Sequence, residues 1–256
     1  MVKTCYGEVK ILVLKNNPSA QRTVPSNDGA VALHSRIAAD FHAKYQSSSS
    51  FRERFALWRT SIFELVDASG EVLDAGCGSG VLSLLACEHA HSVFAFDGSA
   101  EMIALAKGSA ERQAMSNVKF CVAMLCDPSI IATRSFDLIL CSSVLEYVED
   151  YWRAFDWLAG ALKPGGTILF SMPNGASLYR RAERLAFRLT GRPAYYAHVR
   201  NVPTLGEVRA GLARRGFEVR SCQYYAAAPL LSPLARAIGR ADLADNLFVI
   251  ACGLKA

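Results

Sequence analysis

Short apolar runs alternate with helical stretches along most of the chain, and this alternation predicts parallel strands connected by helices. The clearest unit is an apolar run that starts at Val72, a turn that ends at Gly80, and a helix that follows directly. Further strands are expected where apolar runs recur, at residues 92–97, 118–124, 136–143 and 167–172. The pattern therefore predicts an α/β domain.

The first part of the chain is expected to be helical. Residues 1–29 carry little pattern apart from a short apolar run at 8–15, so we expect a flexible N-terminal arm there. Apolar stripes with helical spacing then occupy 31–45 and 51–66, with a serine-rich break between them. We expect these to be cap helices within 30–68, at the start of a single domain that covers 30–256.

Three helices are predicted in the C-terminal half of the chain. The first covers 150–162 and is ended by a Pro-Gly-Gly sequence, and the second covers 177–189. The third covers 204–215, with Thr204 at its N-cap and Glu207 at the capping-box position. The pattern thus predicts both the positions and the stop signals of these helices.

The pattern at the end of the chain predicts two strands, at 217–225 and 246–254. The stretch between them, 226–234, is apolar and interrupted by two prolines. We expect this stretch to form one wall of a ligand pocket, with Tyr224 and Tyr225 at its rim.

Composition narrows the class of protein. The 256 residues are 52% hydrophobic and 20% charged, which allows a large core and excludes disorder. A net charge of +5 is too weak to indicate a nucleic-acid partner. The eight cysteines are scattered without a C-x-x-C pair, so no zinc site is expected and a reducing, cytoplasmic compartment fits best. No secretory leader or membrane-spanning run is recognisable.

The turn after the first strand carries the most specific chemistry. Gly76, Gly78 and Gly80 alternate behind Asp74, and glycine lets a ligand lie directly against the main chain. Asp97 ends the next strand about 20 residues further on, a spacing at which a carboxylate accepts hydrogen bonds from ribose hydroxyls. A structural turn, a nicotinamide dinucleotide site and an S-adenosylmethionine site are all open at this point.

The turn and its neighbours follow a known order of motifs. Residues 72–80, then Asp97, Phe-Asp-Leu-Ile at 136–139 and Leu-Lys-Pro-Gly-Gly at 162–166, resemble class I S-adenosylmethionine-dependent methyltransferases. The Asp-x-Gly-x-Gly-x-Gly order and the lack of a second phosphate-binding turn favour this cofactor over a dinucleotide. The resemblance implies a Rossmann-like, doubly wound, seven-stranded sheet with an antiparallel last strand, N-terminal helices over the cofactor, and a helical lid insertion at 174–203.

The resemblance also implies which residues bind S-adenosylmethionine. Arg54 corresponds to an arginine that pairs with the cofactor's carboxylate, with a solvated surface arginine as the alternative. Met124 occupies a position that often holds an acid for the adenine amino group, which leaves the recognition of adenine to other groups. The expected cofactor-binding set is Tyr45, Arg54, Asp74, Gly76, Cys77, Gly78, Gly80, Asp97, Gly98, Met102, Met124, Leu125, Cys141 and Ser142.

Residues 136–148 and 170–174 look most like the catechol O-methyltransferases of ubiquinone synthesis. Some of those enzymes use a divalent metal held by two glutamates and a histidine from this segment, and only Glu146 matches here. Ser143 and Tyr147 stand in for the other two ligands, and one carboxylate alone rarely holds Mg²⁺. We therefore predict chemistry without a metal, with Glu146 and Tyr147 as catalytic candidates.

A basic stretch lies within 174–203. Arg180, Arg181, Arg184 and Arg188 stand among leucines in the predicted helix, and His198 follows. Such a segment can act as a substrate lid, contact an anionic membrane surface, or form an ordinary solvated surface helix. His198 is a general-base candidate, because the unperturbed pKa of histidine is near neutrality.

The combined expectation is a metal-independent S-adenosylmethionine-dependent methyltransferase that acts on a small, largely apolar or aromatic acceptor, with oxygen as the target atom. Methyl transfer from a sulfonium needs mainly alignment and exclusion of water. The expected partner is a small molecule and not nucleic acid, and the expected location is the cytoplasm, with peripheral contact at the inner membrane face left open. The alternatives are an RNA or protein methyltransferase and a catalytically silent module that binds the cofactor.

Overall fold

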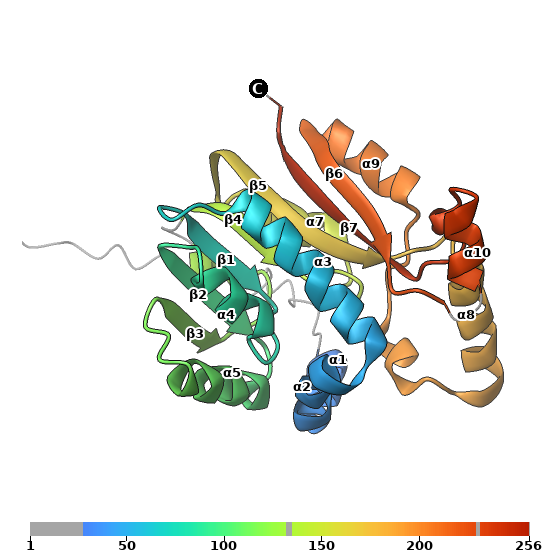
Figure 1. Cartoon of the computed structure of the whole chain (residues 1–256), viewed down its shortest axis with the longest axis horizontal. Coiled ribbons are helices and arrows are strands. Elements are labelled where there is room, and N and C mark those ends of the chain that lie inside the picture. The colour runs from blue at the N-terminus through green and yellow to red at the C-terminus, as the bar shows by residue number, and fades with distance from the viewer. Residues whose placement is uncertain (1–27, 132–134, 229–230, 256) are drawn as a thin grey trace, which may run out of the picture.

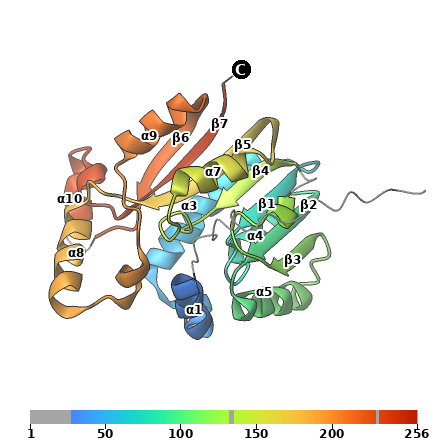
Figure 2. The same cartoon turned by 180° about the vertical axis from the view of Figure 1, so that it is seen from behind.

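The computed structural model describes residues 28–131, 135–228 and 231–255. Its centre is a seven-stranded sheet in the order β3-β2-β1-β4-β5-β7-β6 (Figures 1 and 2). The strands are β1 (Glu71–Ala75), β2 (Ser92–Asp97), β3 (Val118–Val122), β4 (Phe136–Cys141), β5 (Leu162–Pro173), β6 (Phe217–Tyr225) and β7 (Leu247–Leu254). This order confirms the expected Rossmann-like fold.

The sheet reverses its direction of growth between β1 and β4. β1 pairs in parallel with β2 on one side and with β4 on the other, with Val72 opposite both Val93 and Leu138. β7 is antiparallel to both β5 and β6, which confirms the expected antiparallel last strand. In open α/β sheets, ligands bind beyond the carboxyl ends of the strands at such a reversal.

Helices cover both faces of the sheet. On one face lie α3 (Ser49–Leu65), α4 (Val81–Cys87) and α5 (Ala100–Arg112), and α3 crosses the sheet in front in Figure 1. On the other face lie α7 (Tyr151–Ala159) and α9 (Leu205–Arg214), with the short α6 (Pro128–Ile131) nearby. Trp58 and Ile62 of α3 are fully buried. This helix, which belongs to the predicted cap, is therefore part of the core.

The cap differs from its prediction in one respect. The single helix expected at 31–45 is two helices, α1 (Asp28–Arg36) and α2 (Ala38–Ser47), which meet at Ile37. Ile37 has a non-helical backbone (φ −106°, ψ 13°), so the chain changes direction there while Phe41 N–H still donates to its carbonyl. The bend lets α1 contact both α5 and η1 (Ala194–His198). The arm predicted over 1–29, with its short strand at 8–15, lies outside the described residues apart from its last two positions.

The second difference concerns the Lys-Pro-Gly-Gly sequence. It was expected to end a helix at Leu162, but α7 ends at Ala159 and β5 already begins at Leu162. Leu162 pairs with Phe136, and the register then shifts before Leu138 pairs with Thr167. Such an irregularity accommodates Pro164, which has no N–H to donate to a strand.

The segment 174–203 contains α8 (Leu178–Thr190) and η1, and α10 (Leu231–Ala237) with η2 (Ala241–Leu243) follows β6. The Ser177 side chain caps α8 and also donates to the carbonyl of Ala244 at 3.2 Å. Arg236 of α10 forms an ion pair with Asp245 at 2.9 Å. Residues 241–246 therefore hold both α8 and α10 at the same end of the molecule (Figure 1).

The contact between α7 and α9 gives a first prediction. Gly211 of α9 lies so close to Trp152 that a Cβ atom there would overlap the indole ring, and Arg215 stacks on the same ring at 4.1 Å. Gly211→Ala is expected to lower the free energy of unfolding by about 2 kcal/mol, because overpacking forces the ring to move. Thermal denaturation measures the effect.

Gly206, in the first turn of the same helix, is the matched control. The nearest atom to a Cβ there would be the Thr204 hydroxyl at 3.9 Å, so Gly206→Ala should leave stability unchanged or raise it slightly. Equal melting temperatures for the two variants would contradict close packing at Gly211.

Candidate functional site

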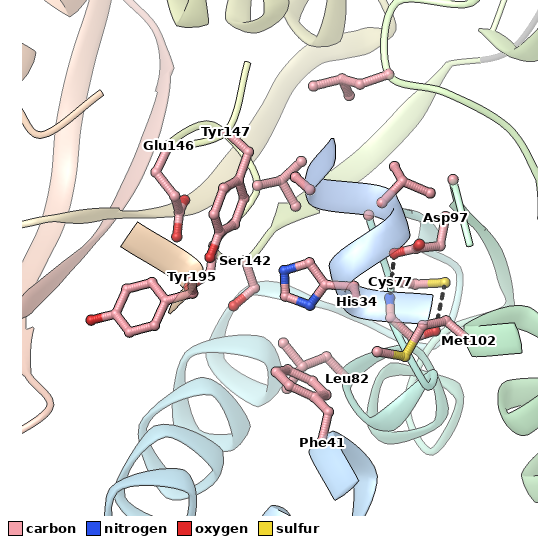
Figure 3. A pocket seen from close by; sticks show the side chains of 18 of the residues that line it. His34, Phe41, Cys77, Leu82, Asp97, Met102, Ser142, Glu146, Tyr147 and Tyr195 are labelled. Carbon is pink, nitrogen blue, oxygen red and sulfur yellow. Dashed lines mark hydrogen bonds between the residues drawn. The ribbon is translucent and has the colours of Figure 1, made fainter. Parts of the chain in front are cut away.

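A pocket of about 380 Å³ lies beyond the carboxyl ends of β1, β2 and β4 (Figure 3). The glycine turn and the end of β2 form one end, the segment after β4 and part of 174–203 form the other, and α1 to α3 lie between them. The residues used below that line it are His34, Phe41, Tyr45, Phe51, Arg54, Asp74, Gly76, Cys77, Gly78, Asp97, Gly98, Met102, Met124, Leu125, Ser142, Ser143, Glu146, Tyr147, Pro173, Arg180, Tyr195 and Leu247.

The glycine turn has the backbone that its sequence predicts. Gly76, Gly78 and Gly80 all have positive φ, between 53° and 78°, which residues with a Cβ adopt only at a cost. The N–H groups of Gly76 and Cys77 both donate to the carbonyl of Phe96, at 2.8 and 2.9 Å. The turn is thereby fixed against the end of β2, with its main chain facing the pocket.

Asp97 is held at the tip of β2. One carboxylate oxygen accepts from Gly78 N–H and the other from Ser99 N–H, each at 2.9 Å. Burial raises the pKa of Asp97, while the two N–H donors and nearby His34 oppose that shift. The carboxylate is therefore oriented by the main chain at the position where the sequence placed a ribose contact.

Asp74 lies deeper than Asp97. It is 1% exposed and accepts a 2.6 Å hydrogen bond from the Ser83 hydroxyl of α4. Burial raises the pKa of Asp74 to about 7, against the effect of the Ser83 hydrogen bond. Asp74 thus joins β1 to α4 underneath the turn, besides lining the floor of the pocket.

Arg54 reaches the pocket from α3. Its Nη2 donates to the hydroxyl of Ser142 at 2.7 Å and to the Ser142 carbonyl at 3.3 Å, across 88 residues of sequence. Its Nε is buried without a hydrogen-bond partner. Within the described part of the chain Arg54 forms no salt bridge, and Glu146 interacts with its charge only at longer range. An anionic group of a ligand would supply a close partner.

Aromatic rings from α1 and α2 cover the pocket. Phe41 makes edge-to-face contacts with His34 at 5.9 Å, with Tyr45 at 6.1 Å and with Phe51 at 5.2 Å. His34 continues this cluster to Tyr147, with ring centroids 5.5 Å apart. The cap helices therefore supply an apolar cover that limits the access of water.

Polar groups gather at the end of the pocket away from the turn. Glu146 is 4% exposed, one of its oxygens has no partner, and burial raises the pKa of its carboxyl to about 7. Arg180 of α8 donates to the Tyr195 hydroxyl at 3.0 Å and to Glu183 at 3.1 Å, and its Nε is unpartnered. Burial also raises the pKa of Tyr147, so its phenol stays protonated.

The structure brings together most of the predicted site residues. Tyr45, Arg54, Asp97, Met124 and Ser142 all line the pocket, with Asp74, Gly76, Cys77, Gly78, Gly98, Met102, Leu125, Glu146 and Tyr147. Gly80, Cys141 and His198 do not. Gly80 packs on Ala106, Cys141 is fully buried in the core, and His198 lies on η1 against Gly29. The roles predicted for these three stay predictions.

The lining residues that were missed from the sequence include His34, Phe41, Arg180 and Tyr195. Phe41 falls on the apolar stripe of the first helix, where such side chains usually indicate a core, and His34 lies on the same predicted helix without a motif around it. Arg180 was named only as a member of the basic segment, which also contains Tyr195. Their role depends on how α8 and η1 fold back over the sheet, for which the sequence gives no local signal.

The wall predicted at 226–234 was wrong. The lining includes neither Tyr224 nor Tyr225, and none of the described residues of that stretch. Tyr225 is 1% exposed and packs in the core cluster that contains Trp58, while Tyr224 packs on Phe248. Pro173 and Leu247 form this side of the pocket instead, because β5 and β7 end next to it.

The donor set fits S-adenosylmethionine. Arg54 offers an unpaired cation for the carboxylate of the cofactor, and Asp97 offers an oriented carboxylate for its ribose hydroxyls. Met102, Met124 and Leu125 provide an apolar slot beyond Asp97, suited to a flat base. The exposed main chain of the glycine turn lies between these groups. Each part of the cofactor thus has a chemically matched counterpart.

Comparisons with known proteins agree with the fold. A protein-family model described as "Methyltransferase domain" matches residues 29–222. The ubiquinone biosynthesis O-methyltransferase of Coxiella burnetii (strain Dugway 5J108-111) is 38% identical over 106 residues, which are 40% of this chain and 43% of that protein. The tRNA 5-carboxymethoxyuridine methyltransferase of Escherichia coli K12 is 36% identical over 108 residues, 42% of this chain and 41% of that protein.

The chain spans less than half the length of these curated relatives, so the similarity to them concerns the matched stretch alone. Among solved structures, the N-methyltransferase NodS of Bradyrhizobium japonicum, in complex with S-adenosyl-L-homocysteine, superposes with a TM-score of 0.63 at 19% identity. That match covers 88% of this chain and 98% of the other, and it shows a shared fold. Because the family model covers most of the chain, this protein belongs to the methyltransferase domain family, within the class that uses S-adenosylmethionine.

Proposed function

We propose that this protein transfers a methyl group from S-adenosylmethionine to an oxygen atom of a small, largely apolar or aromatic acceptor. The observation that carries the proposal is a single, mostly apolar pocket that contains both the cofactor-type groups, Arg54 and Asp97, and a buried Glu146. Residues of α1 and η1 both line this pocket, and the two elements are in contact, which favours a small molecule.

Bound S-adenosylmethionine supplies a methyl group that is already activated by its sulfonium sulfur. The chain's own contribution is to bind, orient and exclude water. Arg54, fixed by Ser142, would hold a carboxylate, and Asp97, fixed by Gly78 and Ser99, would hold hydroxyls. The rings of Phe41 and Tyr147 would keep water away from the centre of the pocket.

Glu146 would give the acceptor its polar contact. Its unpartnered oxygen is buried in a wall that otherwise consists of Tyr147, Tyr195 and Arg180. Because the pKa of this carboxyl is raised to about 7, Glu146 can accept a hydrogen bond as a carboxylate or donate one as an acid. A hydroxyl or carbonyl substituent on an apolar ring would satisfy it.

The test is transfer of labelled methyl from S-adenosylmethionine into cell extract, followed by separation into organic, aqueous and macromolecular fractions. Label in the organic fraction is expected, and oxygen would be identified as the target by release of the label as methyl iodide in hydriodic acid for an ether, or as methanol in mild base for an ester. Label in RNA would instead support the activity named for the Escherichia coli relative. Binding of the cofactor without any transfer would favour a catalytically silent module.

Independence from metal ions gives a separate prediction. Among the described residues, no group of three or more His, Cys, Asp or Glu side chains is placed to hold a metal. Methyl transfer is therefore expected to proceed within about twofold of its full rate in excess EDTA, because one carboxylate does not make a Mg²⁺ site. Loss of activity in EDTA that Mg²⁺ restores would contradict this prediction.

A peripheral membrane contact is the second proposal, favoured by exposed leucines. Leu185 and Leu189 of α8 are 58% and 77% exposed, and Leu178 lies on the same helix face. Leu234 and Ile238, on or just after α10, are similarly exposed. Exposed arginines flank the leucines of α8, so this end of the molecule suits an anionic bilayer surface. No helix among the described residues is long and apolar enough to cross a bilayer.

This contact is testable by sedimentation with vesicles of phosphatidylglycerol or of phosphatidylcholine. The chain is expected to sediment with the anionic vesicles, and the double variant Leu185→Asp, Leu189→Asp should remain in solution. Val122→Asp, which charges an exposed residue on β3 instead, is the matched control and should sediment normally. Equal sedimentation of all three proteins would refute a docking role for α8.

A further inference from the structure

Methylation of a hydroxyl oxygen releases a proton, and a nearby group has to accept it. Among the described residues, His34 is the only histidine that lines the pocket. It comes from α1, and Figure 3 shows its ring between the Asp97 end of the pocket and the end that holds Tyr147 and Glu146. His34 therefore lies where the two ends of the pocket meet.

Two aromatic contacts fix the orientation of the His34 ring. The ring planes of His34 and Tyr147 are inclined by 74° at a centroid distance of 5.5 Å, and those of His34 and Phe41 by 89° at 5.9 Å. Within the part of the chain that the structure describes, neither ring nitrogen of His34 has a hydrogen-bond partner. The nitrogens are thus positioned by packing and remain available to a ligand.

Burial, together with nearby positive groups, favours the neutral form of His34 at neutral pH. Burial lowers the pKa of His34, and the carboxylate of Asp97 opposes this shift without cancelling it. Positive groups on three other elements lower the pKa of His34 further. The titratable groups that face it are Asp97 of β2, His198 of η1, Arg54 of α3, Lys44 of α2 and Tyr147 after β4. A neutral imidazole is the form that can accept a proton.

The other candidates in the pocket are less suited to this role. The Tyr147 phenol is kept protonated by burial, which raises its pKa, so it has no vacant position for a proton. Asp97 already accepts two backbone hydrogen bonds. In Figure 3, Glu146 lies on the far side of the Tyr147 ring from His34, and it is therefore farther from the end of the pocket that holds Asp97. His198 is outside the lining.

We propose that His34 is a catalytic residue that takes the proton of the acceptor's hydroxyl group. The inference rests on the proposed transfer to oxygen. The hydroxyl oxygen uses the electron pair of its O–H bond to form the bond to the methyl carbon, and the proton passes to a ring nitrogen of His34. The electron pair of the broken carbon–sulfur bond stays on sulfur, and the imidazolium later releases its proton to water.

The experiment compares the full chain with His34→Gln and with His89→Gln, a control whose ring packs on Phe63 outside the pocket. Calorimetry with S-adenosylhomocysteine measures cofactor binding, and labelled-methyl transfer into extract between about pH 4.5 and pH 8.5 measures turnover, a range that extends below the ordinary pKa of histidine. His34→Gln is expected to slow transfer by about 100-fold or more, since general-base catalysis contributes roughly 10²–10⁴. Its affinity for S-adenosylhomocysteine should stay within about threefold, as should both properties of His89→Gln.

The pH profile and a spectroscopic measurement separate this role from simple positioning. The wild-type rate should rise with pH through the titration of His34, and the variant should lose that rise. In ¹⁵N-histidine spectra, the His34 ring should titrate at lower pH than an unperturbed histidine, because burial disfavours its charged form.

Three results would overturn the inference. One is a wild-type rate and pH profile for His34→Gln, and another is a loss of cofactor affinity in proportion to the loss of rate, which would make His34 a cofactor contact. The third is a His34 ring that is charged at pH 7. Absence of methyl transfer by the wild-type chain would instead refute the proposed function itself, so the two failures are distinguishable.

Discussion

Arg54→Ala is expected to weaken the binding of S-adenosylmethionine by about 100-fold, because truncating one partner of a buried charge pair costs about 2–5 kcal/mol. The guanidinium of Arg54 is anchored on Ser142 and has an unpartnered Nε, which a ligand carboxylate would satisfy in the proposed site. Isothermal titration calorimetry on the full chain measures the loss. Arg54→Lys keeps the charge but loses the forked geometry, so an intermediate affinity is expected.

A ligand that lacks the carboxylate provides the control for this prediction. 5′-Methylthioadenosine keeps the adenine and ribose of the cofactor but has no amino-acid group. Its affinity should be the same for the wild type and for Arg54→Ala. An equal loss for both ligands would mean that Arg54 supports the pocket wall through Ser142 rather than binding the ligand. If neither ligand loses affinity, Arg54 does not bind the cofactor, which is the alternative given by the sequence.

Asp97→Ala is expected to weaken the binding of S-adenosylmethionine by about 1–3 kcal/mol, the usual worth of a hydrogen bond to a charged group. The substitution also removes the acceptor for Gly78 N–H and Ser99 N–H, so the glycine turn should loosen. Asp97→Asn keeps one carbonyl oxygen for these donors and is the milder variant. Calorimetry measures affinity, and thermal denaturation measures the effect on the turn.

The ribose contact can be isolated by comparing S-adenosylhomocysteine with its 2′-deoxy analogue. The wild type should prefer the ligand with both hydroxyls, and Asp97→Ala should bind the two ligands almost equally. A preference that survives in the variant would move the ribose contact to another residue. This comparison does not depend on how much the variant perturbs the turn, because both ligands meet the same protein.

Features that depend on short-range sequence were predicted well. The strand, glycine turn and helix around Gly76 to Gly80 are as expected, because positive φ at alternate positions leaves glycine as the natural residue. The capping box at Thr204 and Glu207 is present with both of its hydrogen bonds. The final two strands lie at Phe217–Tyr225 and Leu247–Leu254, within one residue of their predicted bounds. In each case the signal lies within about ten residues of sequence.

Features that depend on packing between distant segments were not predicted. Ile37 sits within a continuous helical pattern, and the bend there follows from the docking of α1 against η1, which is 157 residues or more away in sequence. The same docking turns His34 into a pocket residue. The segment 226–234, which two prolines interrupt, was predicted to be one wall of the ligand pocket and not a helix. It nevertheless contains the start of α10, which includes Pro233. A proline in the first turn of a helix is tolerated, since the N–H there needs no partner.

The position of β7 has a consequence for the order in which the protein can be made. β6 has a single neighbour in the sheet, β7, and β5 needs the same strand to cover its outer edge. As the chain is made from its amino end, β5 emerges from the ribosome before β7 has been synthesised. The outer edge of β5 is then free to pair with other nascent chains. A translation pause between residues 226 and 246 would prolong this stage, so slow codons there are expected to lower the yield of soluble protein.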